Sequence, residues 1–308
     1  MEIAIIGLGR MGMNIARRLL RDDHRVFAHN RTAAKIDRIV AEGATGLYDL
    51  ADLGESMNQP RVIWLMLPAG GVVDEYIDRV LPRLTAGDII IDGGNSYYRD
   101  GIRRSAMLEK EKIHFVDVGV SGGIWGLERG YCLMYGGGEQ VCRGLEPIFR
   151  SLAPEGGFLH CGPAGAGHFV KMVHNGIEYG MMQAIGEGFA ILERSPYNES
   201  LDFSRLSHLW NQGSVIRSWL LELAGQAFAR DGRLEELSGR VDDSGEGRWT
   251  VQQAVESGVP APVIALSLFN RFQSRQENDF GNRVLAALRR EFGGHPVTLR
   301  DRSQNDRP

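Results

Sequence analysis

Five polar side chains recur at helical spacing in the middle of the chain: Lys171, His174, Asn175, Glu178 and Tyr179. Positions i, i+3, i+4, i+7 and i+8 place all five on one face of a helix. A desolvated lysine can act as a general base and a glutamate as a general acid, while the other side chains can orient a ligand. Because polar helix faces are common, a solvated surface stripe is the alternative interpretation.

A glycine motif near the start of the chain suggests a second kind of chemistry. Gly7, Gly9 and Gly12 follow a strand-like run and open a helical one. In that context a GxGxxG turn lets the backbone approach a pyrophosphate at a helix N-terminus. The motif predicts a dinucleotide site that includes Arg10 and Met11, and a turn that binds nothing is the alternative.

The end of the next predicted strand should select the cofactor. NAD enzymes usually place a carboxylate there to hold the ribose 2′-hydroxyl, whereas an arginine accommodates the 2′-phosphate of NADP. This chain has Asn30, Arg31 and Thr32 at that point. Because a guanidinium can fork onto phosphate, NADP is favoured and NAD remains possible. The alternative is that Arg31 only solvates the start of a helix.

Two further loops follow strand-like runs and could bind a carboxylate. Ser121, Gly122 and Gly123 offer a hydroxyl and backbone N–H groups, and Asn95 stands in a comparable place within DGGNS, where it is also a candidate cofactor-binding residue. Each is ambiguous alone, since Gly-Gly turns are ordinary loop chemistry.

The elements that must position these residues alternate in the first half of the chain. Strand and helix signals ending in glycine-rich turns indicate a doubly wound α/β, Rossmann-type domain. After the glycine-rich break at 162–167 the pattern becomes helical. We therefore predict a dinucleotide-binding domain at 1–165, an all-helical domain at 166–300, and a polar tail at 301–308. Strands are expected at 2–8, 25–30, 61–68, 88–94, 114–123 and 131–138, and helices at 12–20, from 32, 72–84, 169–192, 204–229, 263–273 and 278–292.

Composition excludes several classes of protein. The chain has 308 residues, is 43% hydrophobic and carries a net charge of −4, so charge gives no drive towards nucleic acid or a membrane surface. Its three cysteines suggest neither a disulfide framework nor a zinc site, and no ligand cluster suggests a metal. No targeting segment is recognisable at the N-terminus, so a reducing cytoplasm is the expected location.

Several motifs together resemble the 6-phosphogluconate dehydrogenase family, the decarboxylating enzymes of the pentose phosphate pathway. GLGRMGMNIARRL, HNRT, DGGNS, VSGG and GHFVKMVHNGIEYGMMQ occur in the family's order, followed by GEGRWT, FNRFQSR and RREFGGH. KxxHNxxEY is the specific part, because related β-hydroxyacid dehydrogenases typically show KxxNN without this glutamate. The resemblance covers nearly the whole chain and points to the family's short form.

The resemblance implies hydride transfer from C3 of 6-phosphogluconate to a nicotinamide, then decarboxylation to ribulose 5-phosphate and CO2. Lys171 matches the family's general base and Glu178 the acid that protonates the enediol. A homodimer or homotetramer is implied, because the family donates tail residues from a neighbouring subunit. The matching substrate residues are Asn95, Ser121, Gly122, Gly123, His174 and Asn175 for the sugar acid, Tyr179, Arg248, Thr250 and Arg271 for the phosphate, and Arg289 and His295 for the tail.

Two departures and two rival functions accompany this interpretation. Arg248 stands where long-form enzymes usually carry lysine, and short-form members are often NAD enzymes although Arg31 favours NADP. A β-hydroxyacid dehydrogenase for a small unphosphorylated acid would not need Glu178, Tyr179, Arg271 and the RREFGGH tail. A cofactor-binding sensor without turnover should lack Lys171 or Glu178, and both are present.

Overall fold

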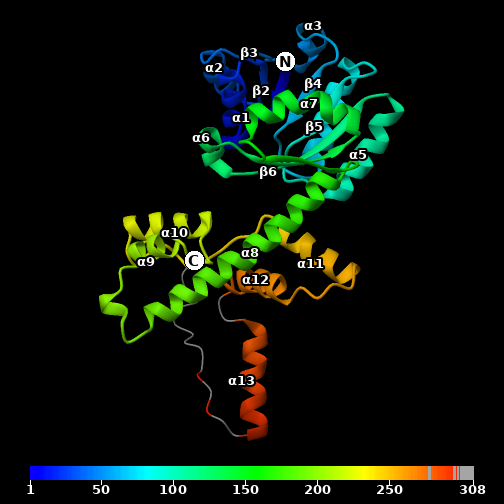
Figure 1. Ribbon diagram of the computed structural model, residues 1–308. Helices are drawn as coiled ribbons and strands as arrows, with labels where there is room; N and C mark the ends of the chain where they lie inside the picture. Colours follow the sequence, from blue (N-terminus) through cyan, green and yellow to red (C-terminus); the bar gives the residue numbers. More distant parts are fainter. Residues whose placement is uncertain (277–278, 294–295, 297, 299–308) are drawn as a thin grey trace, which may run out of the picture. The chain divides into compact units, whose positions relative to one another are not determined.

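The computed structural model describes residues 1–276, 279–293, 296 and 298 (Figure 1). These residues form two compact units. The first contains residues 1–182 and 245–264, and the second contains residues 183–244 and the described residues from 265 onwards. The predicted boundary at residue 165 lies just before a long helix that begins at Ala166. The two compact units instead meet within that helix, after Met182.

The first unit is built on an eight-stranded sheet in the order β3-β2-β1-β4-β5-β6-β7-β8. All neighbouring strands are parallel except β6 and β7, which are antiparallel. The order reverses between β1 and β4, which is the point where doubly wound sheets bind their ligands. The strands are β1 (Glu2–Ile6), β2 (Arg25–His29), β3 (Thr45–Gly46), β4 (Val62–Leu65), β5 (Ile89–Asp92), β6 (His114–Ser121), β7 (Cys132–Gly137) and β8 (Phe158–Gly162).

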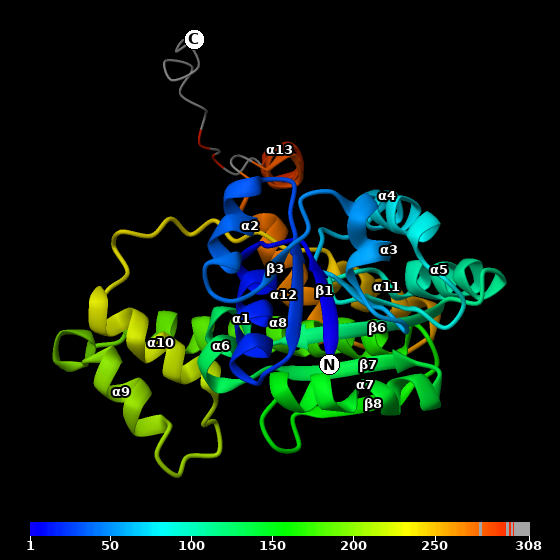
Figure 2. The same cartoon turned by 90° about the horizontal axis from the view of Figure 1, so that it is seen from above.

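Helices cover both faces of this sheet, as Figure 2 shows for α1 and α2 to the left of β1 and α3, α4 and α5 to its right. Successive residues of a strand point to opposite faces, so Ile3 and Ile5 enter one core and Ala4 and Ile6 the other. The continuous apolar run of β1 follows from this double burial. The helices are α1 (Arg10–Arg21), α2 (Ala33–Val40), α3 (Leu53–Ser56), α4 (Gly71–Val80), α5 (Tyr98–Lys110), α6 (Gly126–Arg129) and α7 (Glu139–Leu152).

Two further helices complete the first unit and lead into the second. The long helix α8 (Ala166–Glu193) begins on the sheet, and α11 (Glu246–Glu256) packs beside its N-terminal half. The second unit contains the rest of α8 with α9 (Phe203–Trp210), α10 (Trp219–Arg230), α12 (Pro262–Gln273) from residue 265, and α13 (Phe280–Gly293). Its core is aromatic, with Phe189, Phe203 and Phe228 in mutual ring contact.

The Rossmann-type fold with a helical C-terminal part is confirmed, with one error among the predicted helices. The single helix expected at 204–229 is wrong, because the chain leaves the helical conformation after Asn211. Gly213 adopts a φ of +76°, and the Ser218 side chain accepts the Leu221 N–H at the start of a new helix. Within the described residues, no helix is long and apolar enough to cross a bilayer.

Candidate active site

The predicted polar face of α8 is a connected network rather than a solvated stripe. Lys171 Nζ donates to Asn175 Oδ1 at 2.8 Å, and Nδ1 of His174 lies 3.0 Å from the same oxygen. Lys171 is 6% exposed and Asn175 is 8% exposed. Among the described residues, no carboxylate is in hydrogen-bond contact with Lys171. A buried lysine that donates to an amide is typical of a site and atypical of a surface.

The end of β6 meets this network. Ser121 Oγ lies 3.3 Å from Nε2 of His174. Two residues earlier, a Cβ at Gly119 would stand 2.3 Å from Cβ of Lys171, so only glycine lets α8 approach the strand so closely. The turn after β6 also needs glycine, because Gly122 and Gly123 have φ angles of +130° and +53°. The predicted Ser121 turn and the Lys171 face are therefore neighbours.

The acid and the base of the predicted pair have different surroundings. Burial lowers the pKa of Lys171, although the carboxylates of Glu178 and Glu246 act in the opposite direction. Glu178 is partly exposed, and its Oε2 lies 3.9 Å from Nδ1 of His174. A buried amine can lose its proton more easily than in water, while a partly exposed carboxyl can exchange protons with solvent.

Helix α11 packs against the same part of α8 through small residues. Oγ1 of Thr250 lies 2.7 Å from the carbonyl oxygen of Met172 and 2.8 Å from that of Glu246, and both can accept its proton. Cβ atoms at Gly176 and Gly247 would meet Thr250 and the ring of Tyr179, respectively. The buried Thr250 hydroxyl therefore joins the two helices, a contact different from the predicted one to phosphate, and its role towards phosphate stays a prediction.

The structure adds two buried carboxylates that sequence reasoning missed. Glu246 is 2% exposed at the first position of α11, where it acts on Lys171. Asp117 lies within β6 and accepts the backbone N–H groups of Gly165 at 2.5 Å and His168 at 2.7 Å, so it holds the start of α8. Burial raises the pKa of Asp117. An aspartate inside an otherwise apolar strand was the available signal.

The glycine turn between β1 and α1 has the geometry that an anionic cofactor requires. Gly7 has a φ of +102°, and a Cβ at Gly12 would stand 2.0 Å from the Gly7 carbonyl oxygen. A Cβ at Gly9 would instead enter open space, and no side chain caps α1 at this residue. The first N–H groups of α1 thus face a space that a pyrophosphate could fill, with Arg10 and Met11 beginning the helix.

The residues after β2 also reach this turn. Asn30 Oδ1 accepts the N–H of Leu8 at 3.0 Å, which fixes the glycine turn to the end of β2. Arg31 and Thr32 are exposed beside it. Asp37, the nearest downstream carboxylate, accepts a hydrogen bond from the Tyr48 hydroxyl at 2.6 Å. These residues fit a phosphorylated ribose because the cationic Arg31 is presented at the expected position.

Asn95 is exposed in the turn between β5 and α5, whereas its neighbours Gly94 and Ser96 are buried. Because β1, β2, β4, β5 and β6 are parallel, their carboxyl ends lie along one edge of the sheet. The glycine turn, Asn30, Asn95 and Ser121 all follow strand ends on this edge. Most of the predicted site residues are therefore brought to one side of the first unit.

Three of the predicted residues lie in the second unit or outside the described residues. Arg271 belongs to the second unit, where its Nη1 donates to the carbonyl oxygen of Asp242 at 2.9 Å. Arg289 is exposed on α13, and His295 lies outside the described residues. Their contributions to substrate binding stay predictions.

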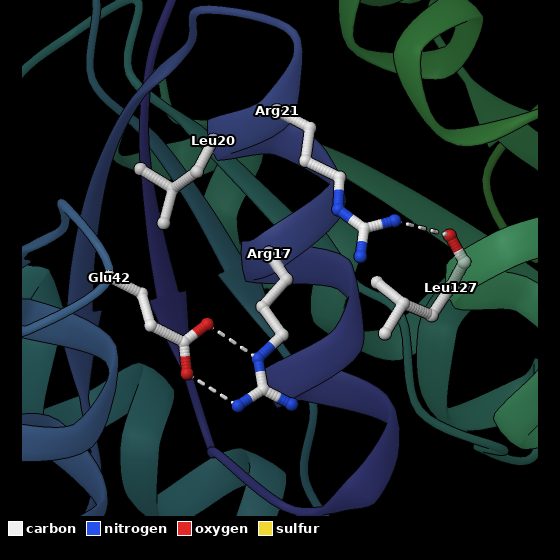
Figure 3. A pocket seen from close by; sticks show the side chains of 5 residues that line it. All are labelled: Arg17, Leu20, Arg21, Glu42 and Leu127. Atoms are coloured by element: carbon white, nitrogen blue, oxygen red, sulfur yellow. Dashed lines mark hydrogen bonds and ion pairs between the residues drawn. The ribbon is translucent and has the colours of Figure 1, made fainter.

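A surface hollow of about 450 Å³ lies beside the C-terminal half of α1 and contains none of the predicted residues (Figure 3). Arg17 forms a two-point ion pair with Glu42 there, and Arg21 points towards the carbonyl oxygen of Leu127. Since both arginines already have acceptors, the hollow does not resemble an open anion site.

Comparison with known proteins identifies two family models. The model of the NAD binding domain of 6-phosphogluconate dehydrogenase matches residues 2–162. The model of the 6-phosphogluconate dehydrogenase C-terminal domain matches residues 167–304. Together they cover both parts of the chain.

Individual relatives agree with these models. The YqeC protein of Bacillus subtilis (strain 168) is 45% identical over 96% of this chain and 98% of its own. The NAD(+)-dependent decarboxylating 6-phosphogluconate dehydrogenase of Haloferax volcanii is 41% identical over 98% of this chain and 100% of its own. The solved Plasmodium falciparum 6-phosphogluconate dehydrogenase, described with NADP+ and with 6-phosphogluconate, has a TM-score of 0.81 and 28% identity over 98% of this chain and 67% of that chain. The chain belongs to the 6-phosphogluconate dehydrogenase family.

Proposed function

We propose that this protein catalyses the oxidative decarboxylation of 6-phosphogluconate to ribulose 5-phosphate and CO2, with NADP preferred as the hydride acceptor over NAD. The observation that carries the proposal is the buried Lys171 amine, joined through Asn175 to His174 and Ser121. Family membership supplies the substrate, and the site supplies groups suited to each proton transfer.

Lys171 acts first as the general base. Burial lowers its pKa, so more of the amine is neutral at a given pH and able to take the proton of the C3 hydroxyl. The bound nicotinamide supplies the acceptor for the hydride that leaves C3. The resulting lysine ammonium then lies beside the new keto group. Its positive charge stabilises the negative charge that develops on the keto oxygen as CO2 departs.

Glu178 acts in the second half of the reaction. Loss of CO2 breaks the bond between the carboxylate carbon and C2, and the Lys171 ammonium gives its proton to the C3 oxygen, which leaves an enediol. Glu178 then gives a proton to the carbon that becomes C1, while Lys171 takes back the proton of the C3 hydroxyl and so restores the keto group of the product. Its partial exposure allows the carboxyl to regain a proton from solvent before the next turnover.

The remaining residues hold the two anionic ends of the substrate. We assign Asn95, Ser121, Gly122, Gly123, His174 and Asn175 to the sugar acid. Arginine forks suit a phosphate, so Arg248 and Arg271 are assigned to it together with Tyr179 and Thr250. Arg289 and His295 are assigned to a neighbouring subunit's site, which makes the enzyme a homodimer or homotetramer. Its cysteines are free, in keeping with a reducing cytoplasm.

The test is the initial rate of nicotinamide reduction with 6-phosphogluconate, measured in parallel with NADP and NAD. Higher kcat/KM with NADP supports the substrate and the role of Arg31 together. A clear NAD preference would keep the reaction and overturn the cofactor assignment. Absence of reduction with both cofactors, together with turnover of a small unphosphorylated 3-hydroxy acid, would overturn the substrate.

A further inference from the structure

A buried cation lies behind the loops that carry the site. Arg104, on α5, is 0% exposed. Its Nε donates to Asp74 at 2.8 Å, its Nη1 donates to Asp92 at 3.1 Å, and its Nη2 donates to the carbonyl oxygen of Gly70 at 3.0 Å. Burial opposes the charged form, but the carboxylates of Asp74 and Asp92 outweigh it and raise the pKa of Arg104. The guanidinium is thus fixed and fully charged.

Asp92 connects Arg104 to the turn that carries Asn95. While Oδ2 of Asp92 accepts from Arg104, its Oδ1 accepts the N–H of Gly94 at 3.2 Å. Asp92 is itself fully buried. The ion pair therefore fixes the backbone immediately before Asn95, whose side chain is exposed at the sheet edge.

Gly70 connects Arg104 to a second segment, residues 66–70. Gly70 precedes α4 with a φ of +100° and ends the segment 66–70 that follows β4. Because β4 pairs with β1 where the strand order reverses, this segment borders the dinucleotide position in such sheets.

The two segments are also in direct contact with each other. A Cβ at Gly94 would stand 2.6 Å from the carbonyl oxygen of Leu67, and one at Gly93 would stand 1.8 Å from Nε1 of Trp64. This contact leaves no room for a side chain, so the segment before Asn95 cannot move towards Leu67 without displacing the segment 66–70. A single buried guanidinium holds both from behind.

We propose that Arg104 is a positioning residue that couples the two ligand sites: through Gly70 and Asp92 it fixes the cofactor-side and substrate-side segments together, so that each bound ligand favours binding of the other. This inference rests on the proposed function. Such a coupling is reciprocal, since each ligand must change the affinity for the other by the same factor.

The test compares Arg104→Lys with Arg103→Met. Arg103 is a matched control because it lies on the same helix and donates to both oxygens of Asp74 at 2.9 Å, yet it is exposed and has no contact with Asp92 or Gly70. The Kd of 6-phosphogluconate is measured with and without NADPH, the reduced cofactor that cannot accept a hydride, alongside kcat and KM for the reaction with NADP. We expect Arg104→Lys to lose a coupling factor of roughly tenfold, within the usual range for coupled sites, and Arg103→Met to keep it.

A second variant guards against misfolding of the first. Asp92→Asn keeps the size of the side chain and an oxygen for the Gly94 N–H, but removes the ion pair with Arg104. It should lose coupling in the same way. The inference is overturned if Arg104→Lys and Asp92→Asn both fold and show the same coupling factor as Arg103→Met. It is also overturned if the wild type is active but binds its two ligands independently. A wild type that does not turn over 6-phosphogluconate would instead show that the proposed function is wrong.

Discussion

Asn175 Oδ1 accepts a hydrogen bond from Lys171 Nζ at 2.8 Å, one helical turn away on α8. The same oxygen lies 3.0 Å from Nδ1 of His174, which must therefore carry a proton to make a favourable contact. In neutral His174, Nε2 is then an acceptor for the hydroxyl of Ser121. One amide oxygen thus orients the base and sets the histidine tautomer that faces the substrate side chains.

Replacement of the lysine tests the base directly. Lys171→Met should lower kcat for 6-phosphogluconate oxidation by at least roughly 10²-fold, because a positioned general base contributes about 10²–10⁴-fold. NADP binding, measured by fluorescence titration, should persist because the glycine turn is untouched. Substantial residual turnover would remove Lys171 from this role.

The pH dependence of kcat/KM should report the lysine. The neutral amine is the active form, so kcat/KM should rise with pH through the folded-state pKa of Lys171, which burial lowers from the ordinary value of 10.5. The Glu246 carboxylate raises that pKa, so Glu246→Gln should move this limb to lower pH. Glu256→Gln is the control, since Glu256 is exposed on the same helix and pairs with Arg99. The same pH dependence of kcat/KM in the wild type, Glu246→Gln and Glu256→Gln would contradict the assignment of this limb to Lys171.

The role of Glu178 as the acid should be distinguishable from the role of Lys171 as the base. Glu178→Gln should slow CO2 release and enediol protonation more than NADP binding, because its amide cannot supply the proton. Single-turnover measurement of reduced cofactor, CO2 and ribulose 5-phosphate in the same experiment would separate oxidation from these two steps. Glu187→Gln serves as control, as Glu187 is an exposed residue of α8 that accepts a hydrogen bond from Gln183. Wild-type rates for both steps in Glu178→Gln would show that another group is the acid.

Close packing of the base on the sheet predicts a cost in stability. Gly119→Ala would bring a Cβ within 2.3 Å of Cβ of Lys171, so either α8 or β6 must move. We expect the free energy of unfolding to fall by about 1–3 kcal/mol, as for other overpacked sites. Gly144→Ala, on α7, has open space and should be neutral or stabilising. Denaturant unfolding measures the free energy of unfolding of both variants. Equal values for Gly119→Ala and Gly144→Ala would contradict the close approach of α8 to β6.

Local signals were sufficient to predict the parts of the site formed by neighbouring residues. The spacing from Lys171 to Tyr179 placed these side chains on one helix, and the run ending at Gly12 gave a strand, a turn and a helix in order. Both patterns depend on contacts within a few residues, which a single sequence records directly.

Contacts between distant segments could not be predicted in this way. Glu246 approaches Lys171 only because α11 packs on α8, and no periodicity within GEGRWT indicates that partner. The buried pair of Arg104 and Asp92 joins the end of a strand to the following helix, where each residue alone resembles an ordinary charged side chain. Likewise, the apolar spacing of 204–229 continues across the break between Trp210 and Trp219, so this spacing does not show where the first helix ends.

Cofactor choice should depend on Arg31. Its exposed guanidinium follows β2 beside Asn30, at the position where an acidic residue would hold a ribose hydroxyl. Arg31→Ser removes a charged donor for the 2′-phosphate, and hydrogen bonds to charged groups contribute about 1.5–3 kcal/mol. We therefore expect kcat/KM with NADP to fall by roughly tenfold or more, with little change for NAD. Arg38→Met is the matched control, because Arg38 is an exposed cation further along α2. An unchanged ratio of kcat/KM for the two cofactors in Arg31→Ser would exclude Arg31 as the selecting residue and leave the reaction itself intact.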